Sequence, residues 1–176
     1  MGKGRIAAAT LAGITAIAAL AAPLAAQQDR INPFAARLLE AHNSARDDVG
    51  VPRLAWSAEL ARDAQAWANH LARQGRMEHA GREARRGRGE NLWMGHAGTY
   101  GAETMVGAFV DERRYFRNST FPEVSTTGKW QDVGHYTQVI WRDTQQVGCA
   151  VARGRQDDFL VCRYWPAGNT YGRKTY

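Results

Sequence analysis

Residues 134–144 read Gly-His-Tyr-Thr-Gln-Val-Ile-Trp-Arg-Asp-Thr, which places four polar side chains directly before an apolar run. The segment constrains the fold because its Val-Ile-Trp half favours burial, whereas the imidazole, phenol, hydroxyl and amide before it need polar partners or a cleft. Its β-branched and aromatic residues favour a strand. Polar groups placed in this way at the edge of a core are candidates for a functional site.

The composition is that of one globular domain. The chain has 176 residues, 44% of them hydrophobic, with six Trp, six Tyr and five Phe available for a core. This length fits a single domain, and the aromatic and aliphatic content argues against a disordered or collagen-like chain.

The first 26 residues have the pattern of an export signal rather than that of a folded segment. Lys3 and Arg5 precede an uncharged, Ala-rich run over residues 7–26 that ends in small residues. We expect residues 1–26 to be a signal peptide and residues 27–34 a short linker, so that the mature protein is secreted to an extracellular or periplasmic space. Retention as an anchor is the alternative, because about 20 uncharged residues can just span a bilayer.

Two cysteines in an exported chain predict one disulfide. Residues 147–152 and 159–162 have the composition of strands, and a tight hairpin between them would place Cys149 opposite Cys162. Directly opposed strand residues can meet the distance that a disulfide requires. The alternative is a pair of buried free thiols, which expression in the cytosol would favour.

Helical periodicity is clearest in three segments. Apolar residues recur at helical spacing over 33–48, 58–74 and 102–116, and a glycine follows each of the first two. Residues 91–94 are a short strand candidate, and the polar, Arg- and Gly-rich residues 76–90 indicate a loop.

Four arginines of this loop, Arg82, Arg85, Arg86 and Arg88, form a concentrated basic stretch. Removal of residues 1–26 would leave 21 basic and 17 acidic groups, a formal charge of +4. The stretch could contact a membrane surface or an envelope polymer of negative charge, or it could be a solvated loop. It lacks interleaved aromatic residues, so we expect no nucleic-acid partner.

Four short motifs point to a known family. They are His42-Asn43-Ser44-Ala45-Arg46, Gly89-Glu90-Asn91-Leu92, residues 134–144, and residues 159–169 with the sequence Phe-Leu-Val-Cys-Arg-Tyr-Trp-Pro-Ala-Gly-Asn. In these motifs and in their order, the chain resembles the CAP superfamily of pathogenesis-related group 1, cysteine-rich secretory and antigen 5 proteins over residues 35–176. The resemblance implies an α+β fold, a three-layer α-β-α sandwich, with a short helix at 134–144 and framework roles for His42 and Arg46.

The resemblance also implies a cleft with two histidines and two acids, here His79, Glu90, Glu112 and His135. Two imidazole nitrogens suit Zn²⁺ or another divalent metal ion, and only two protein ligands would make an open, weak site. Glu90 and Glu112 would orient the rings by accepting their N–H groups. Because the core and the cysteines lie elsewhere, we expect the fold to tolerate substitution of all four residues.

The sequence lacks common hydrolase motifs. It contains neither His-Glu-x-x-His nor Gly-x-Ser-x-Gly, and Ala80 follows the first histidine where relatives often have serine. Phe109 stands where relatives often have Trp, a difference expected to alter packing but not the site. We therefore expect a monomeric, non-enzymatic protein that binds a metal ion weakly and a small apolar or lipid ligand such as a sterol. The alternatives are a metal-assisted hydrolase of peptides or other extracellular polymers, which would use the same four residues, and a structural module docking on the envelope.

Overall fold

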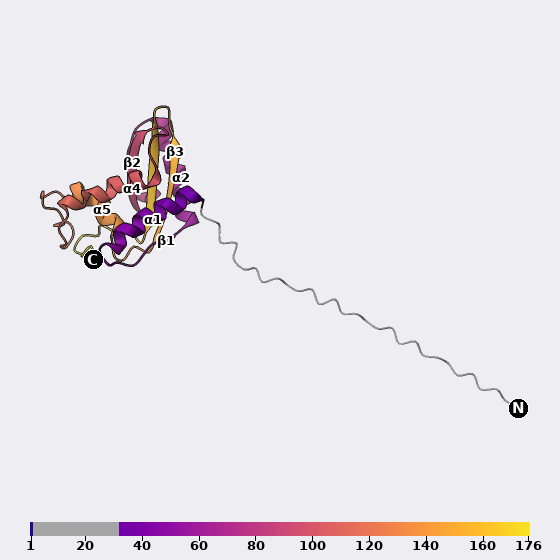
Figure 1. Ribbon diagram of the computed structural model, residues 1–176, viewed down its shortest axis with the longest axis horizontal. Coiled ribbons are helices and arrows are strands. Elements are labelled where there is room, and N and C mark those ends of the chain that lie inside the picture. The colour runs from indigo at the N-terminus through magenta and orange to yellow at the C-terminus, as the bar shows by residue number, and fades with distance from the viewer. Residues whose placement is uncertain (2–31) are drawn as a thin grey trace. The chain divides into compact units, whose positions relative to one another are not determined.

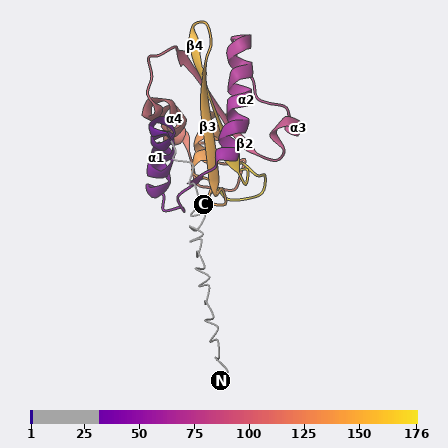
Figure 2. The same cartoon turned by 90° about the vertical axis from the view of Figure 1, so that its right-hand side faces the viewer.

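The chain folds into three layers. The computed structural model describes residue 1 and residues 32–176, so the predicted signal peptide after Met1 and most of the predicted linker lie outside the described residues. A four-stranded sheet lies between helix α2 (Ala58–Gln74) on one face and helices α1 (Pro33–Asp47), α4 (Ala102–Val110) and α5 (Gly134–Val139) on the other (Figure 1, Figure 2). The α+β three-layer sandwich is confirmed. None of the helices in this described part is long and apolar enough to cross a membrane.

The sheet has the strand order β1-β3-β4-β2, which makes β2 an edge strand. Strands β3 (Gln146–Arg153) and β4 (Asp157–Trp165) form the predicted antiparallel hairpin. Strand β2 (Gly89–His96) pairs antiparallel with β4, and the short β1 (Ala55–Trp56) pairs parallel with β3. The family motifs at 89–92 and 159–169 therefore come from neighbouring strands.

The central hairpin is cross-linked by the predicted disulfide. Cys149 and Cys162 are directly opposed, and their Cα atoms lie 4.1 Å apart. The bond fixes the pairing of β3 with β4. That register matters because a shift by one residue would turn every side chain to the other face of the sheet.

Local signals account for the two long helices. The side chains of Asn32 and Ser57 accept backbone N–H groups at the starts of α1 and α2. Gly75, with a φ of 67°, ends α2 in the left-handed conformation that glycine adopts most readily. The predicted bounds 33–48 and 58–74 are confirmed to within one residue.

Three predicted elements need correction. The helix expected over 102–116 is α4 followed by a 3-10 turn, η1 (Asp111–Tyr115), whose tighter winding brings an acidic side chain against α5. The strand expected at 91–94 is longer, because β4 pairs with β2 along its whole length. The polar loop predicted over 76–90 contains one helical turn, α3 (Arg82–Arg85). Outside these three elements, a second 3-10 turn, η2 (Trp130–Val133), precedes α5.

Apolar side chains fill both faces of the sheet. The larger core lies against α1, α4 and α5 and includes Leu38, Met105, Phe109, Tyr136, Ile140, Leu160 and Tyr164. The smaller core lies beneath α2 and consists of Ala64, Ala68, Leu71, Leu92, Ala152, Phe159 and Val161. Helix α2 approaches β3 so closely that a Cβ atom at Gly148 would collide with backbone atoms of the helix.

Candidate functional site

Charged side chains from distant parts of the chain hold both ends of the short helix α5. At its start, Glu112 Oε2 accepts the backbone N–H groups of His135 and Tyr136 at 2.9 and 3.1 Å. At its end, the Arg46 guanidinium donates to the carbonyl of Val139 at 2.8 Å. Both charges complement the helix dipole, whereas a helix this short would not persist alone. The helix implied by the family resemblance therefore forms in place of the strand that local composition favours.

Arg46 acts as a buried clamp on the segment after α5. Its guanidinium donates to a set of backbone carbonyls, those of Pro52, Val139, Trp141, Arg142 and Thr144. Burial lowers the pKa of Arg46 to about 10, which still leaves the group charged at neutral pH. Its position in the interior agrees with the framework role expected for this residue.

The ring of His135, in the first turn of α5, is held from two sides. Its Nδ1 lies 2.6 Å from Oε1 of Glu112, and the ring stacks on Phe109 with centroids 5.2 Å apart. An ionised carboxylate can only accept a hydrogen bond, so in the neutral ring Nδ1 carries the proton and Nε2 keeps its lone pair. The side chain is 35% exposed, which leaves it open to a ligand. Phe109 therefore touches the site directly, contrary to the expectation that it affects packing alone.

His79, in the loop before α3, is arranged in the same way. Its Nδ1 lies 2.6 Å from Oε1 of Glu90, and the same oxygen accepts the backbone N–H of Ala80 at 3.1 Å. The side chain of His79 is 58% exposed. As in His135, the carboxylate fixes the proton on Nδ1 of the neutral ring and leaves the lone pair on Nε2.

Glu90 differs from Glu112 in its burial and in its charged partner. The Glu90 side chain is 0% exposed and pairs with Arg163 of β4, whose side chain is 2% exposed, whereas the Glu112 side chain is 20% exposed. Burial lowers the pKa of Arg163, and the charges of Glu90 and Asp63 oppose that shift. Arg163 is not among the site residues predicted from the sequence. The pattern Phe-Leu-Val-Cys-Arg-Tyr-Trp nevertheless indicates it, because an arginine inside an apolar strand needs a buried partner of opposite charge.

The four predicted site residues form two His–Glu pairs, each connected to the start of β2. Glu90 on this strand holds His79, and the next residue, Asn91, donates to the carbonyl of His135 at 3.0 Å. The two pairs are thus linked through neighbouring residues of one strand. Each pair presents one imidazole nitrogen that the carboxylate does not use.

A compact group of potential metal ligands occurs elsewhere in residues 32–176. The ligating atoms of His42, Cys149 and Cys162 lie within 4.8 Å of one another, and this is the one such group of three in the described residues. Its two sulfur atoms are bonded to each other and are not thiolate ligands. Within this described part of the chain, no three of His79, Glu90, Glu112 and His135 place their ligating atoms within 4.8 Å of one another.

The basic stretch near His79 is partly engaged within the fold. The Arg88 side chain is only 14% exposed and pairs with Glu59 and Asp63 of α2. Among residues 32–176, ion pairs are not found for the other three arginines of the stretch. Arg88 therefore anchors the loop, and a contact with an anionic surface would rest on the remaining three.

Comparison with known proteins agrees with this architecture. A family model described as the cysteine-rich secretory protein family, CAP, matches residues 39–164. Pathogenesis-related protein 1C of Nicotiana tabacum is 37% identical over 139 residues, which cover 78% of each chain. Pathogenesis-related protein PRMS of Zea mays is 37% identical over 141 residues, which cover 78% of this chain and 80% of the maize protein.

Solved structures share the fold. The crystal structure of NaASP2 with Zn²⁺ matches with a TM-score of 0.71 and 27% identity, over 85% of this chain and 88% of that one. The crystal structure of Na-ASP-1 matches with a TM-score of 0.70 and 25% identity, over 81% of this chain and 41% of that one. Because the family model spans most of the described residues and the plant relatives are 37% identical, the chain belongs to the CAP family of cysteine-rich secretory proteins.

Proposed function

We propose that this CAP protein is exported and binds a divalent metal ion, Zn²⁺ in the first place, through the Nε2 atoms of His79 and His135. The observation that carries the proposal is that both rings place Nδ1 2.6 Å from a carboxylate oxygen. This arrangement is typical of metal-binding histidines, because it fixes the tautomer and makes the other nitrogen a better ligand. Neutral imidazole suits Zn²⁺, and the structure of NaASP2 with Zn²⁺ supports that choice of ion.

The metal site would be weak and open. Glu90 is poorly placed to ligate, because its side chain is 0% exposed and both of its oxygens already accept hydrogen bonds. Two protein nitrogens are fewer than the three ligands of typical catalytic zinc sites and the four of structural ones. Ala80 offers no nucleophilic oxygen, so we favour binding over catalysis. The alternative, a metal-assisted hydrolase, would rely on a metal-bound water for the attack.

Substitution of both histidines should abolish specific Zn²⁺ binding. The double variant His79→Ala/His135→Ala lacks both ligating nitrogens, and each single variant should retain at most weak binding. Binding to the wild type should also weaken in acid, because protons compete with metal for imidazole. Isothermal titration calorimetry with zinc chloride, on the protein lacking residues 1–26, measures these affinities.

His96→Ala is the matched control for the metal experiment, because His96 is an exposed histidine at the other end of β2. It should bind Zn²⁺ as the wild type does. Equal affinity in the wild type and the double variant would refute the proposed site. Hydrolysis of a peptide or polysaccharide that requires both Zn²⁺ and His135 would favour the hydrolase instead.

A second proposed function is the binding of a lipid chain between α1 and α4. A groove of about 470 Å³ lies between these helices. Its small and apolar lining consists of Ala41, Ala45, Gly107 and Val110, and the rest of its lining is polar or charged, namely Arg37, Glu40, Ser44, Asp48, Glu103 and Arg113. Its volume falls within the range of small-molecule sites. Two of its lining residues, Val110 and Arg113, flank Glu112 in the sequence. The small and apolar part of this lining suits an acyl chain or a sterol, and the charged part suits the polar end of such a ligand.

Filling the groove should block lipid binding. A Cβ atom at Gly107 would meet nothing within 4 Å, so Gly107→Leu can place its side chain in the groove without a clash at the backbone. We expect this variant to lose binding of cholesterol or palmitate, measured with fluorescent analogues, while Ala66→Leu on the exposed face of α2 binds like the wild type. Unchanged binding in Gly107→Leu would exclude the groove, and no binding by the wild type would exclude the lipid function.

A further inference from the structure

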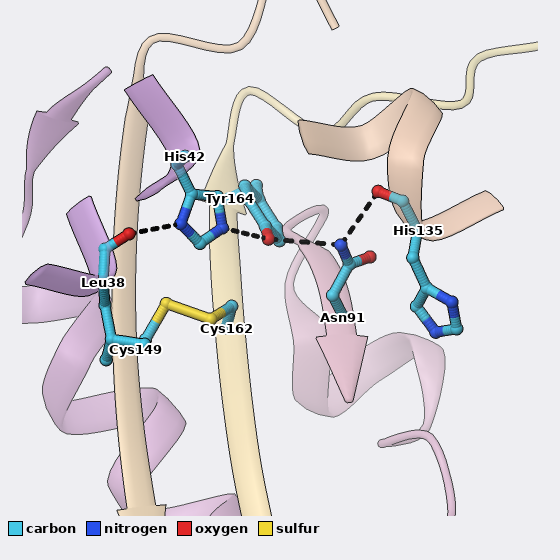
Figure 3. Close-up of a disulfide and its surroundings, with 7 residues drawn as sticks. All are labelled: Leu38, His42, Asn91, His135, Cys149, Cys162 and Tyr164. Atoms are coloured by element: carbon cyan, nitrogen blue, oxygen red, sulfur yellow. Dashed lines mark hydrogen bonds between the residues drawn. A yellow bond between two sulfur atoms is a disulfide. The ribbon is translucent and has the colours of Figure 1, made fainter. Parts of the chain in front are cut away.

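A chain of hydrogen bonds runs through the core from α1 to the site (Figure 3). His42 Nδ1 bonds to the carbonyl of Leu38 at 2.7 Å, and its Nε2 lies 2.8 Å from the Tyr164 hydroxyl. The Asn91 amide nitrogen donates to the same hydroxyl at 3.2 Å and to the carbonyl of His135 at 3.0 Å. The chain therefore joins α1, β4, β2 and α5, and it ends on a histidine of the candidate site.

Only one arrangement of protons satisfies every bond of this chain when His42 is neutral. The carbonyl of Leu38 can only accept, so His42 carries its proton on Nδ1 and accepts at Nε2 from the Tyr164 hydroxyl. The hydroxyl oxygen in turn accepts one N–H of Asn91. The second N–H of the same amide is left for the carbonyl of His135, which also can only accept.

Burial keeps the two ionisable members of the chain neutral. His42 and Tyr164 are both fully buried. Burial is the main cause that lowers the pKa of His42 to about 4 and raises the pKa of Tyr164. The chain is therefore complete at neutral pH, and Asn91 is held with its amide nitrogen pointing toward α5.

We propose that Asn91 is a positioning residue for the metal-binding nitrogen of His135, and that Tyr164 and His42 hold Asn91 in the required orientation. The inference rests on the proposed metal function. Glu112 accepts hydrogen bonds from the backbone N–H and from Nδ1 of His135, and the Asn91 amide donates a hydrogen bond to the carbonyl of His135. Of the polar atoms of His135, only Nε2 is left for a ligand.

Asn91 follows Glu90 directly on β2, so the two residues connect one strand to both histidines of the candidate site. Neighbouring residues of a strand point to opposite faces of the sheet. Glu90 accordingly pairs with Arg163, which also pairs with Asp63 of α2, whereas Asn91 bonds to α5 on the other side. One dipeptide of edge strand β2 thereby sets the spacing of His79 and His135. Loss of the Asn91 bond would free the carbonyl end of His135 to move relative to His79.

Two substitutions test the role of Asn91. Asn91→Ala removes the bond to His135, and we expect its affinity for Zn²⁺ to fall by about 10-fold, at the lower end of the effect of outer hydrogen-bond partners. Tyr164→Phe removes one oxygen atom that is two hydrogen bonds away from His135. This variant should lower the affinity for Zn²⁺ by a smaller factor than Asn91→Ala does. Calorimetry with zinc chloride gives the affinities, and NMR of the imidazole rings without metal should show His135 signals that broaden or split while those of His79 stay unchanged.

Leu71→Ala is the control for a general loss of stability, because Leu71 lies in the core beneath α2, away from the hydrogen-bond chain. It should leave both the Zn²⁺ affinity and the His135 signals unchanged. Wild-type affinity and unaltered His135 signals in Asn91→Ala would overturn the inference. If that variant does not fold, the same readouts on Tyr164→Phe decide the question. Absence of Zn²⁺ binding in the wild type would count against the metal function, whereas the NMR comparison would still test the positioning.

Discussion

Glu90→Gln should lower the free energy of unfolding by about 3 kcal/mol or more, because it leaves the buried guanidinium of Arg163 without its closest carboxylate. Glu112→Gln should cost far less, since the Glu112 side chain is 20% exposed and its neighbours can be solvated. Urea denaturation followed by circular dichroism at pH 7 measures both changes. The sequence suggests that the fold tolerates replacement of all four site residues, and the buried pair of Glu90 with Arg163 leads us to predict otherwise for Glu90.

The double variant Glu90→Gln/Arg163→Met provides the control for this effect. Replacing both members of a buried ion pair is often close to neutral, whereas removing one member is costly. We therefore expect the double variant to recover part of the stability that Glu90→Gln loses. A Glu90→Gln protein within about 1 kcal/mol of the wild type would show that the pair contributes no more than an exposed salt bridge does.

The titration of His42 by itself should lower the free energy of unfolding by about 3 kcal/mol as the pH falls from about 6.5 to about 4. Burial lowers the pKa of this histidine in the folded protein to about 4 from its ordinary 6.5. Between these two values the unfolded chain takes up a proton that the folded protein does not, so acid favours unfolding. The contribution of His42 is therefore complete above the unfolded pKa and is lost as the pH approaches the folded one.

His42→Gln separates this effect from the titration of carboxylates. The amide does not titrate, so the variant should be less stable at pH 7 but should show a shallower loss of stability between about pH 6.5 and about pH 4. Urea denaturation at several pH values within this window gives the two slopes. The assignment to His42 would be wrong if wild type and variant lost stability with the same slope.

The two His–Glu pairs are chemically unequal although their hydrogen-bond distances match. Arg163 balances the charge of Glu90 in the interior, so the His79 pair belongs to a buried ion-pair network that extends to α2. Glu112 instead accepts backbone N–H groups of α5 and is partly exposed. The His79 pair is therefore anchored through Glu90 of β2, whereas the position of the His135 pair depends on a short helix. This difference gives a physical reason for the separate support that Asn91 supplies to His135.

Features with local causes could be predicted from the sequence. The bounds of α1 and α2 follow from apolar spacing, from the caps Asn32 and Ser57, and from the glycine that ends α2. The disulfide follows from two strand-like segments separated by a short turn, which brings the cysteines into register. The motifs identified the family and contain Glu90 and His135, and the family resemblance added His79 and Glu112 to the candidate site.

Only the tertiary structure decided how these residues are held. Residues 134–144 favour a strand by composition, but Glu112 and Arg46 stabilise the two ends of a helix there from 23 and 93 positions away. The pairing of Glu90 with Arg163 and the bond of Asn91 to Tyr164 each span 73 positions. Such contacts arise when strands and helices pack, and local periodicity carries no information about them. The sequence therefore determined which chemical groups are available, whereas packing determined which nitrogen atoms remain free for a ligand.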